Sequence, residues 1–148
     1  MTGMNADGLS AEERIRAELR SLRSQVVGVH GSMVATSDGF LVAHDIVDLE
    51  PTQIAALIAT TLGLARQTTI ATGRGQFREA VARGSDGYLA VFSIGANSVM
   101  AVIGTNDLNI GMLHYQTREL IKRIADHSAD LGQAHHGRNL LDGTFGMS

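Results

Sequence analysis

The hydrophobic pattern changes its period in the first fifty residues. Between residues 15 and 26 apolar side chains recur at steps of four, three and four, the spacing of one helix face, and the Ser10 to Glu13 motif ahead of them is a capping box. From Val29 to Thr36 the period is two, which predicts a strand. Ser37-Asp38-Gly39 supplies a tight reversal, and the apolar run 40–46 predicts a second strand that completes a hairpin.

The next predicted helix is uncharged. It begins at Pro51, which suits a first helical turn because its missing N–H would be unpaired there, and no charged residue occurs up to Ala65. One face carries the large residues Ile54, Leu57, Ile58 and Leu62, and a second face carries the small residues Ala56, Ala59, Thr60 and Gly63. Such a helix is expected to be covered on two sides. We expect it to be too short to cross a membrane, so a partner chain is the simplest cover.

The second half of the chain predicts three strands and a last helix. The Gly-containing segment 72–75 ends the uncharged helix, and the alternation over 77–83 predicts a third strand. The runs 88–94 and 99–104 have no polar face, which is typical of central strands buried on both sides. Apolar positions then keep helical spacing over 110–125.

The predicted order of elements is therefore α-β-β-α-β-β-β-α. It indicates an α+β fold with a five-stranded, mostly antiparallel sheet and helices on both faces, which covers every apolar surface except the outer side of the second helix. We expect one domain over 10–125. The segments 1–9 and 126–148 are polar, contain Gly and lack periodicity, so we expect both to be flexible.

Composition excludes several classes of function. The 148 residues include 12 basic and 15 acidic side chains, a formal charge of −3, so nucleic acid is not an expected partner. The chain has no cysteine, which excludes disulfides, thiolate nucleophiles and cysteine-ligated metals. The N-terminus has neither the basic start nor the apolar run of a secretory signal. We therefore expect a cytoplasmic protein without direct membrane insertion.

Motifs for catalysis, cofactors or metals do not converge. Gly73-Arg74-Gly75 lacks the order and the lysine of a phosphate loop, and no Gly-x-Ser-x-Gly motif occurs. His30 and His44 fall on the predicted hairpin, where they are candidates to face each other, but no His-x3-His pair accompanies them. Asp38, Asp86 and Asp107 stand beside turn residues and suit local backbone bonding. We predict no catalytic residue, no cofactor, no metal site and no enzymatic activity.

Four short motifs, in this order, resemble one family. They are Gly28-Val29-His30-Gly31, the hairpin segment 37–43, Gly87-Tyr88-Leu89 and the segment 107–111. With the uncharged helix between them, they resemble the Roadblock family of dynein light chains and its bacterial relatives over residues 15–124. The resemblance is greatest to the actinobacterial Roadblock proteins that are encoded beside a sensor-kinase-like protein and a small Ras-like GTPase.

This resemblance implies a profilin-like layout and a homodimer. Two sheets would join through their third strands into one ten-stranded sheet, and the second helices would pack side by side across the two-fold axis. The implied dimer interface comprises Ala56, Ala59, Thr60, Gly63, Phe77, Glu79, Val81 and Arg83. Two-fold symmetry pairs residues of one sheet face, so pairing centred on Val81 sets Glu79 opposite Arg83 of the partner subunit, whereas centring on Glu79 opposes like charges.

The resemblance further implies a non-enzymatic adaptor or regulator of a small Ras-like GTPase, in a cytoplasmic complex that includes a sensor-kinase-like membrane protein. The candidate GTPase contacts are Gln53, Ala56, Thr60, Arg66 and Gln67. These positions also suit plain dimer contacts or a solvated helix surface. The alternative function is a small-molecule-sensing α/β module without a GTPase partner, which requires an enclosed pocket with convergent polar groups.

Overall fold

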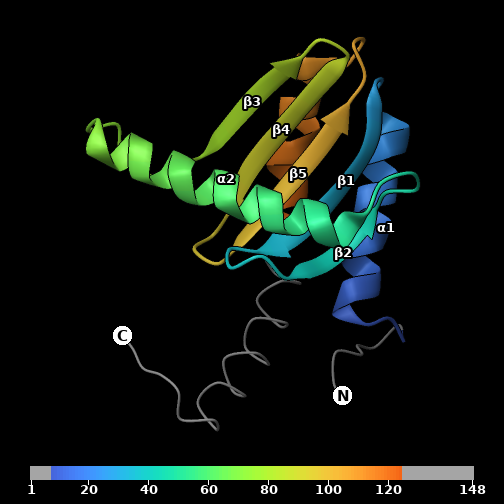
Figure 1. Ribbon diagram of the computed structural model, residues 1–148. Coiled ribbons are helices and arrows are strands. Elements are labelled where there is room, and N and C mark those ends of the chain that lie inside the picture. Colours follow the sequence, from blue (N-terminus) through green and yellow to red (C-terminus); the bar gives the residue numbers. More distant parts are fainter. Residues whose placement is uncertain (1–7, 125–148) are drawn as a thin grey trace, which may run out of the picture.

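The computed structural model describes residues 8–124, and its elements follow the predicted order (Figure 1). They are α1 (Ala11–Gln25), β1 (Val29–Thr36), β2 (Leu41–Asp45), α2 (Pro51–Ala71), β3 (Glu79–Gly84), β4 (Gly87–Ile94) and β5 (Ser98–Gly104). A C-terminal helix follows over residues 110–124. All strand pairs are antiparallel and the sheet order is β2-β1-β5-β4-β3, which confirms the predicted α+β fold. Most of the segment 1–9 and all of 126–148 lie outside the described residues.

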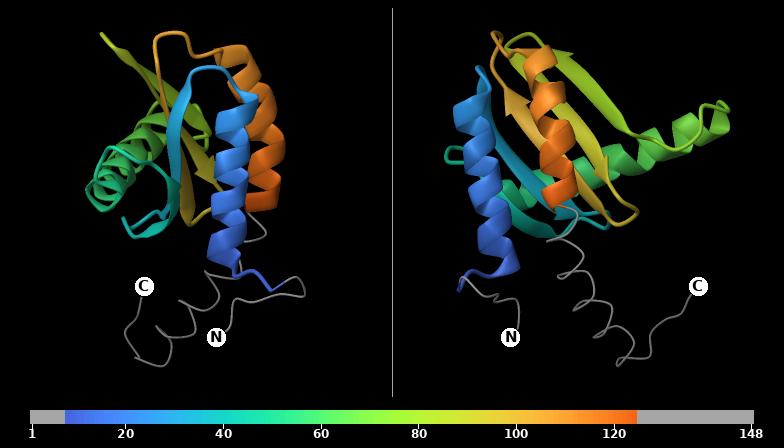
Figure 2. Two further views of the ribbon diagram at one scale, coloured as in Figure 1. Left: turned by 90° about the vertical axis from the view of Figure 1, so that its right-hand side faces the viewer. Right: turned by 180° about the vertical axis from the view of Figure 1, so that it is seen from behind.

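The sheet separates two helical layers. α1 and the C-terminal helix lie on one face, and α2 crosses the other face obliquely (Figure 2). The first layer buries Ile15, Leu19 and Leu22 of α1, and the second buries Ala55, Ile58 and Leu62 of α2. β1, β5 and β4 lie between the two cores, as predicted for the two runs without a polar face.

The start of α1 has the predicted capping box. The Ser10 hydroxyl oxygen accepts from the Glu13 N–H at 3.1 Å, and the Glu13 carboxylate accepts from the Ser10 N–H at 2.9 Å. The hydrogen bond from the Ser10 N–H, followed by one from the Ser10 side chain, holds the pKa of the Glu13 carboxyl below its ordinary value. The N–H groups of Ser10 and Glu13, which lack a partner within the helix, therefore both have a hydrogen-bond acceptor.

The turn after α1 requires Gly28. This residue has φ +90°, and a Cβ placed on it would overlap the backbone of Leu108. The Gly28 carbonyl accepts from the Thr105 N–H at 2.8 Å, so the turn and the loop after β5 are held in direct contact. Both the left-handed conformation and the close approach exclude a side chain here.

α2 differs from its prediction in length and orientation. It extends over 21 residues to Ala71, and by length and composition alone it is long and apolar enough to cross a membrane, so the expectation that it is too short was wrong. Only 17% of its most apolar 18-residue window is buried. Leu57, predicted on the inner face, is 61% exposed, and Ala55 packs against the sheet instead. A helix that is apolar on all sides does not reveal its inner face from spacing.

We predict that Gly28→Ala lowers the free energy of unfolding by about 2 kcal/mol or more, since it adds backbone strain and a clash. Gly73→Ala is the matched control: Gly73 has φ +73°, but a Cβ there meets no atom within 4 Å. That control should cost about 1 kcal/mol. Urea denaturation of both variants measures the difference, and equal losses would show that the contact with Leu108 is unimportant.

Candidate interaction surface

β3 is a regular and fully exposed edge strand. All six of its residues are exposed, and its pairing with β4 runs from Glu79 to Gly84 without a register shift. Among the described residues no strand pairs with its outer edge. The opposite edge strand, β2, is shorter, and its register with β1 shifts after Val34. Its last residue, Asp45, is also paired with α1, since its carboxylate lies 2.6 Å from Nε of Arg23. Of the two edges, β3 is the better template for another strand.

The side chains of β3 divide between the two faces as predicted. One face carries Glu79, Val81 and Arg83, which lie opposite Phe92, Ala90 and Tyr88 of β4. Phe92 and Ala90 belong to the core on the side of α1 and the C-terminal helix, and Tyr88 packs against it. On this face Nδ1 of His114, in the C-terminal helix, lies 2.9 Å from the Glu79 carboxylate. The Arg83 guanidinium lies 5.7 Å from the centre of the Tyr88 ring. Val81, between the two charged residues, is 41% exposed.

Phe77 is a correction to the predicted interface. β3 begins at Glu79, so Phe77 precedes the strand, and its side chain is only 8% exposed. It packs with Ile58 and Leu62 in the core beneath α2. The alternation along β3 would put Phe77 on the same face as Glu79 and Val81, but because the regular strand begins only at Glu79, Phe77 packs on the opposite face, beneath α2.

The outer surface of α2 is apolar although it contains several threonines. Ala56, Thr60 and Gly63 are exposed and Ala59 is half-buried. The hydroxyls of Thr60, Thr61 and Thr68 donate to the carbonyls four residues earlier, at 3.1, 3.0 and 2.8 Å. Their hydroxyls are therefore bonded within the helix, and the surface also carries three large apolar residues, Leu57, Leu64 and Ile70, each more than 60% exposed. An apolar surface of this extent is typical of an interface.

The C-terminal part of α2 projects past the β3 edge. In Figure 1 this end of the helix extends beyond β3, and Figure 2 shows it standing clear of the sheet from behind. Of the candidate GTPase contacts on α2, Gln53, Ala56, Thr60 and Gln67 are exposed. Arg66 is half-buried, and its guanidinium donates to the Ser93 hydroxyl and the Gly95 carbonyl. The sequence analysis missed this inward contact, as well as the exposure of Leu64 and Ile70.

The two hairpin histidines do not meet. His44 lies opposite Met33 in the register, and its Nδ1 accepts from the Ile46 N–H at 3.1 Å. His30 instead lies 3.0 Å from the Asp48 carboxylate, which lowers the pKa of that carboxyl. Within residues 8–124 no group of three or more acidic or histidine side chains could hold a metal ion.

Asp38 and Asp107 lie in turns as predicted, but they bond threonine hydroxyls and not the local backbone that was expected. Asp38 accepts from the Thr36 hydroxyl at 2.6 Å, and Asp107 accepts from the Thr105 hydroxyl. Both bonds connect residues two positions apart, so the carboxylates stabilise their own turns. Both carboxylates are therefore occupied by these turn contacts and do not point into a ligand site.

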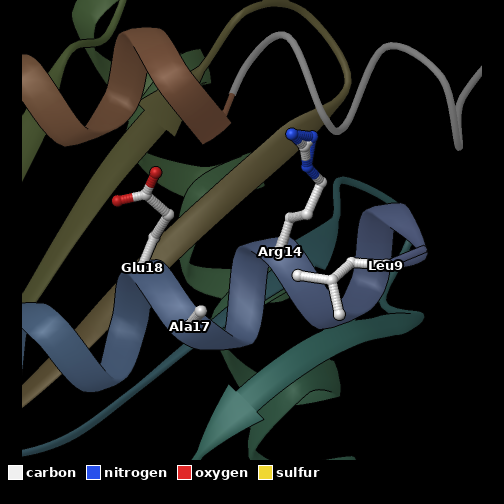
Figure 3. Close-up of a pocket in the computed structure, with 4 residues that line it drawn as sticks. All are labelled: Leu9, Arg14, Ala17 and Glu18. Atoms are coloured by element: carbon white, nitrogen blue, oxygen red, sulfur yellow. The ribbon is translucent and has the colours of Figure 1, made fainter. Parts of the chain in front are cut away.

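A shallow depression lies along the N-terminal half of α1 (Figure 3). Leu9, Arg14, Ala17 and Glu18 line it, and its volume is about 250 Å³. It is open to solvent, and the Glu18 carboxylate accepts from Arg123 of the C-terminal helix at 2.9 Å. This depression is not the enclosed pocket that a small-molecule sensor requires.

The sequence model of the Roadblock/LC7 domain matches residues 16–104. The chain belongs to the Roadblock/LC7 family. The matched segment of this Roadblock/LC7 chain runs from α1 to the last residue of β5 and contains both the β3 edge and α2. No curated protein sequence matches the chain.

Solved structures share the Roadblock fold. A Roadblock/LC7 domain from Streptomyces avermitilis has a TM-score of 0.73 at 21% identity and covers 77% of this chain and 97% of its own. The gliding protein MglB from Thermus thermophilus has a TM-score of 0.70 at 17% identity, covering 79% and 90%. Myxococcus xanthus MglB has a TM-score of 0.71 at 16% identity, covering 76% and 93%. At these identities the likeness establishes the fold.

The burial of Phe77 in the Roadblock/LC7 chain predicts a large effect on stability. Phe77→Ala should lower the free energy of unfolding by about 3 kcal/mol or more, because it empties a packed site beneath α2. Val81→Ala, at an exposed position two residues into β3, should change it by less than about 1 kcal/mol in the monomer. Denaturant unfolding at dilute protein concentration tests both variants. A small loss of unfolding free energy for Phe77→Ala would contradict the burial of Phe77.

Proposed function

We propose that this Roadblock/LC7 chain forms a homodimer through β3 and α2, and that the dimer is an adaptor or regulator of a small Ras-like GTPase. One observation carries the proposal. The exposed edge strand and the projecting part of α2, which carries no charged residue beyond Arg66, lie at the same side of the sheet, so one partner can cover both.

A second copy of the chain meets both requirements at once. A two-fold axis at β3 pairs the outer backbone groups of two β3 strands and continues the sheet beneath the projecting part of α2. Leu64 and Ile70, which are 61% and 66% exposed, then gain a surface to pack on. Full burial of one such side chain contributes about 1.5–3 kcal/mol. The exposed small residues Ala56, Thr60 and Gly63, with the half-buried Ala59, permit close approach of the two α2 helices.

We further propose that the β3 pairing is centred on Val81. Glu79 would then lie between the His114 ring of its own chain and Arg83 of the partner subunit, so that each carboxylate faces an arginine and not a second carboxylate. Pairing centred on Glu79 would place two carboxylates together at the axis. The contact of Glu79 with His114 supports a carboxylate already held in place on this face of the strand.

Cross-linking tests the dimer and its register together. The chain has no cysteine, so Val81→Cys introduces a single thiol. In the proposed register the two introduced thiols face each other with Cα atoms about 4.5–5.5 Å apart, within the range for a disulfide. We expect rapid oxidation to a covalent dimer.

Two matched variants complete this test. Ala82→Cys and Glu79→Cys place the thiol on the same strand, but in a Val81-centred pairing each is offset along the strand from its own copy, too far to be bridged. Neither should cross-link readily. Faster cross-linking of Glu79→Cys than of Val81→Cys would overturn the register, and a wild-type chain that sediments as a monomer at about 100 μM would overturn the homodimer.

The GTPase part of the proposal rests on membership of the Roadblock/LC7 family and on the apolar α2 surface. Gln53 and Gln67 are exposed there and are the proposed contacts, whereas Ala56 and Thr60, also candidates, are assigned to the contact between the two α2 helices. Arg66 is removed from the contact set because its guanidinium is bonded to the sheet. A sensor-kinase-like membrane protein in the same complex, and the cytoplasmic location, stay predictions.

Affinity purification from native cells tests the GTPase proposal. We expect a Ras-like GTPase to co-purify with the tagged chain, to a different extent with and without a non-hydrolysable GTP analogue. Gln53→Arg should reduce its recovery about tenfold, as for a central contact residue. Arg20→Gln, exposed on α1 at the other face of the sheet, is the control and should leave recovery unchanged. Recovery of the dimer alone under both nucleotide conditions would contradict the proposal.

A further inference from the structure

We propose that Arg66 and Ser93 are positioning residues that set the direction of the projecting part of α2 relative to β3. The inference rests on the proposed homodimer, because it concerns how the two interface elements are presented to a second copy of the chain. Arg66 is the only charged residue of α2. Its Nη2 donates to the Ser93 hydroxyl at 3.2 Å and to the Gly95 carbonyl at 3.4 Å.

Arg66 lies where α2 leaves the sheet. The fully buried residues of the helix end at Leu62, and beyond Arg66 every residue of α2 except the half-buried Thr69 is exposed. The hydroxyls of Thr68 and Thr69 donate to carbonyls of α2 itself. Within the described residues, Arg66 is therefore the last α2 side chain that forms a hydrogen bond to the sheet.

Ser93 connects this point to the start of β3. Its N–H donates to the carbonyl of Arg78, the residue before β3, at 2.9 Å. Its hydroxyl oxygen accepts a hydrogen bond from the Arg66 guanidinium, and the hydroxyl donates to the Gly95 carbonyl at 3.2 Å. One residue of β4 thus contacts α2 through its side chain and the beginning of β3 through its backbone, while the connection over 72–78 is exposed except for Phe77.

The consequence is a fixed angle between the helix and the strand. A hydrogen bond from a charged donor is stronger and more directional than a neutral one. Without it, Ala55, Ile58 and Leu62 still hold the first part of α2 on the sheet, so the domain stays folded. The projecting part then has no side-chain hydrogen bond to the sheet, so the end of the helix is more mobile and must be ordered when a second copy binds, which opposes association.

Dimer affinity and fold stability separate this role from a general structural one. Sedimentation equilibrium of the full chain should give a dimer dissociation constant about tenfold higher for Arg66→Met and for Ser93→Ala than for wild type. The double variant should be no weaker than Arg66→Met, because both changes remove the same contact. Arg66→Lys should recover part of the affinity. Arg74→Met is the matched control, since the Arg74 side chain donates to the nearby Thr72 carbonyl and not to the sheet, and it should leave the constant unchanged.

Hydrogen exchange supplies a readout that overall destabilisation would not reproduce. In Arg66→Met the amides of residues 67–71 should exchange faster, while those over 55–62 keep wild-type protection. Uniform loss of protection along α2, or a double variant whose effects multiply, would overturn the positioning role. Wild-type affinity in both single variants would also overturn it and leave the homodimer standing, whereas a monomeric wild type would overturn both.

Discussion

The chemistry of α2 is the constraint on which the rest of the molecule depends. The helix contains one charged residue, and that residue is directed onto the sheet. The hydroxyls of Thr60, Thr61 and Thr68 are bonded to carbonyls of the same helix, so the outward surface is mainly methyl groups and aliphatic side chains. A single α2 cannot cover a five-stranded sheet and also bury all of its own surface. The oblique crossing buries one face of α2 and leaves the rest of its surface exposed in the single chain.

The helices on the opposite face of the sheet do not leave an extended apolar surface exposed in this way. α1 and the C-terminal helix bury a stripe each, and their outer sides carry charged residues such as Arg20 and Lys122. The C-terminal helix lies beyond the segment matched by the family, yet His114 joins it to Glu79 on β3. The contact between Glu79 and His114 thus connects the edge strand to the C-terminal helix, while among the described residues no strand pairs with the outer edge of β3.

The sequence was most informative where one period dominated. The capping box at Ser10 and the stripe from Ile15 to Val26 predicted α1, and the two runs without a polar face predicted central strands, because periodicity reports local burial directly. It failed for Leu57 and Phe77. An apolar residue in an apolar helix has no spacing that identifies its inner face, and Phe77 continues the alternation of a strand that it does not enter.

The site was predictable only in part for a related reason. The open edge and the apolar helix are visible as patterns, and both were expected to contact a partner. The contact of Arg66 with Ser93 joins residues 27 positions apart and depends on the path of α2 across the sheet. No local pattern encodes such a pair, so a side chain expected to face a partner proved to face its own sheet.

The two unlike edges of the sheet have a consequence for how far assembly proceeds. A sheet with two regular edges can add copies from both ends and grow into a fibre. Here β2 is short, irregular in register and tied to α1 by the Arg23 to Asp45 pair, whereas β3 is straight and open. If two copies join at β3 as proposed, only β2 lies at either end of the combined sheet, and β2 is a poor template for a further strand. A sheet built in this way would stop growing at two copies, without any separate cap.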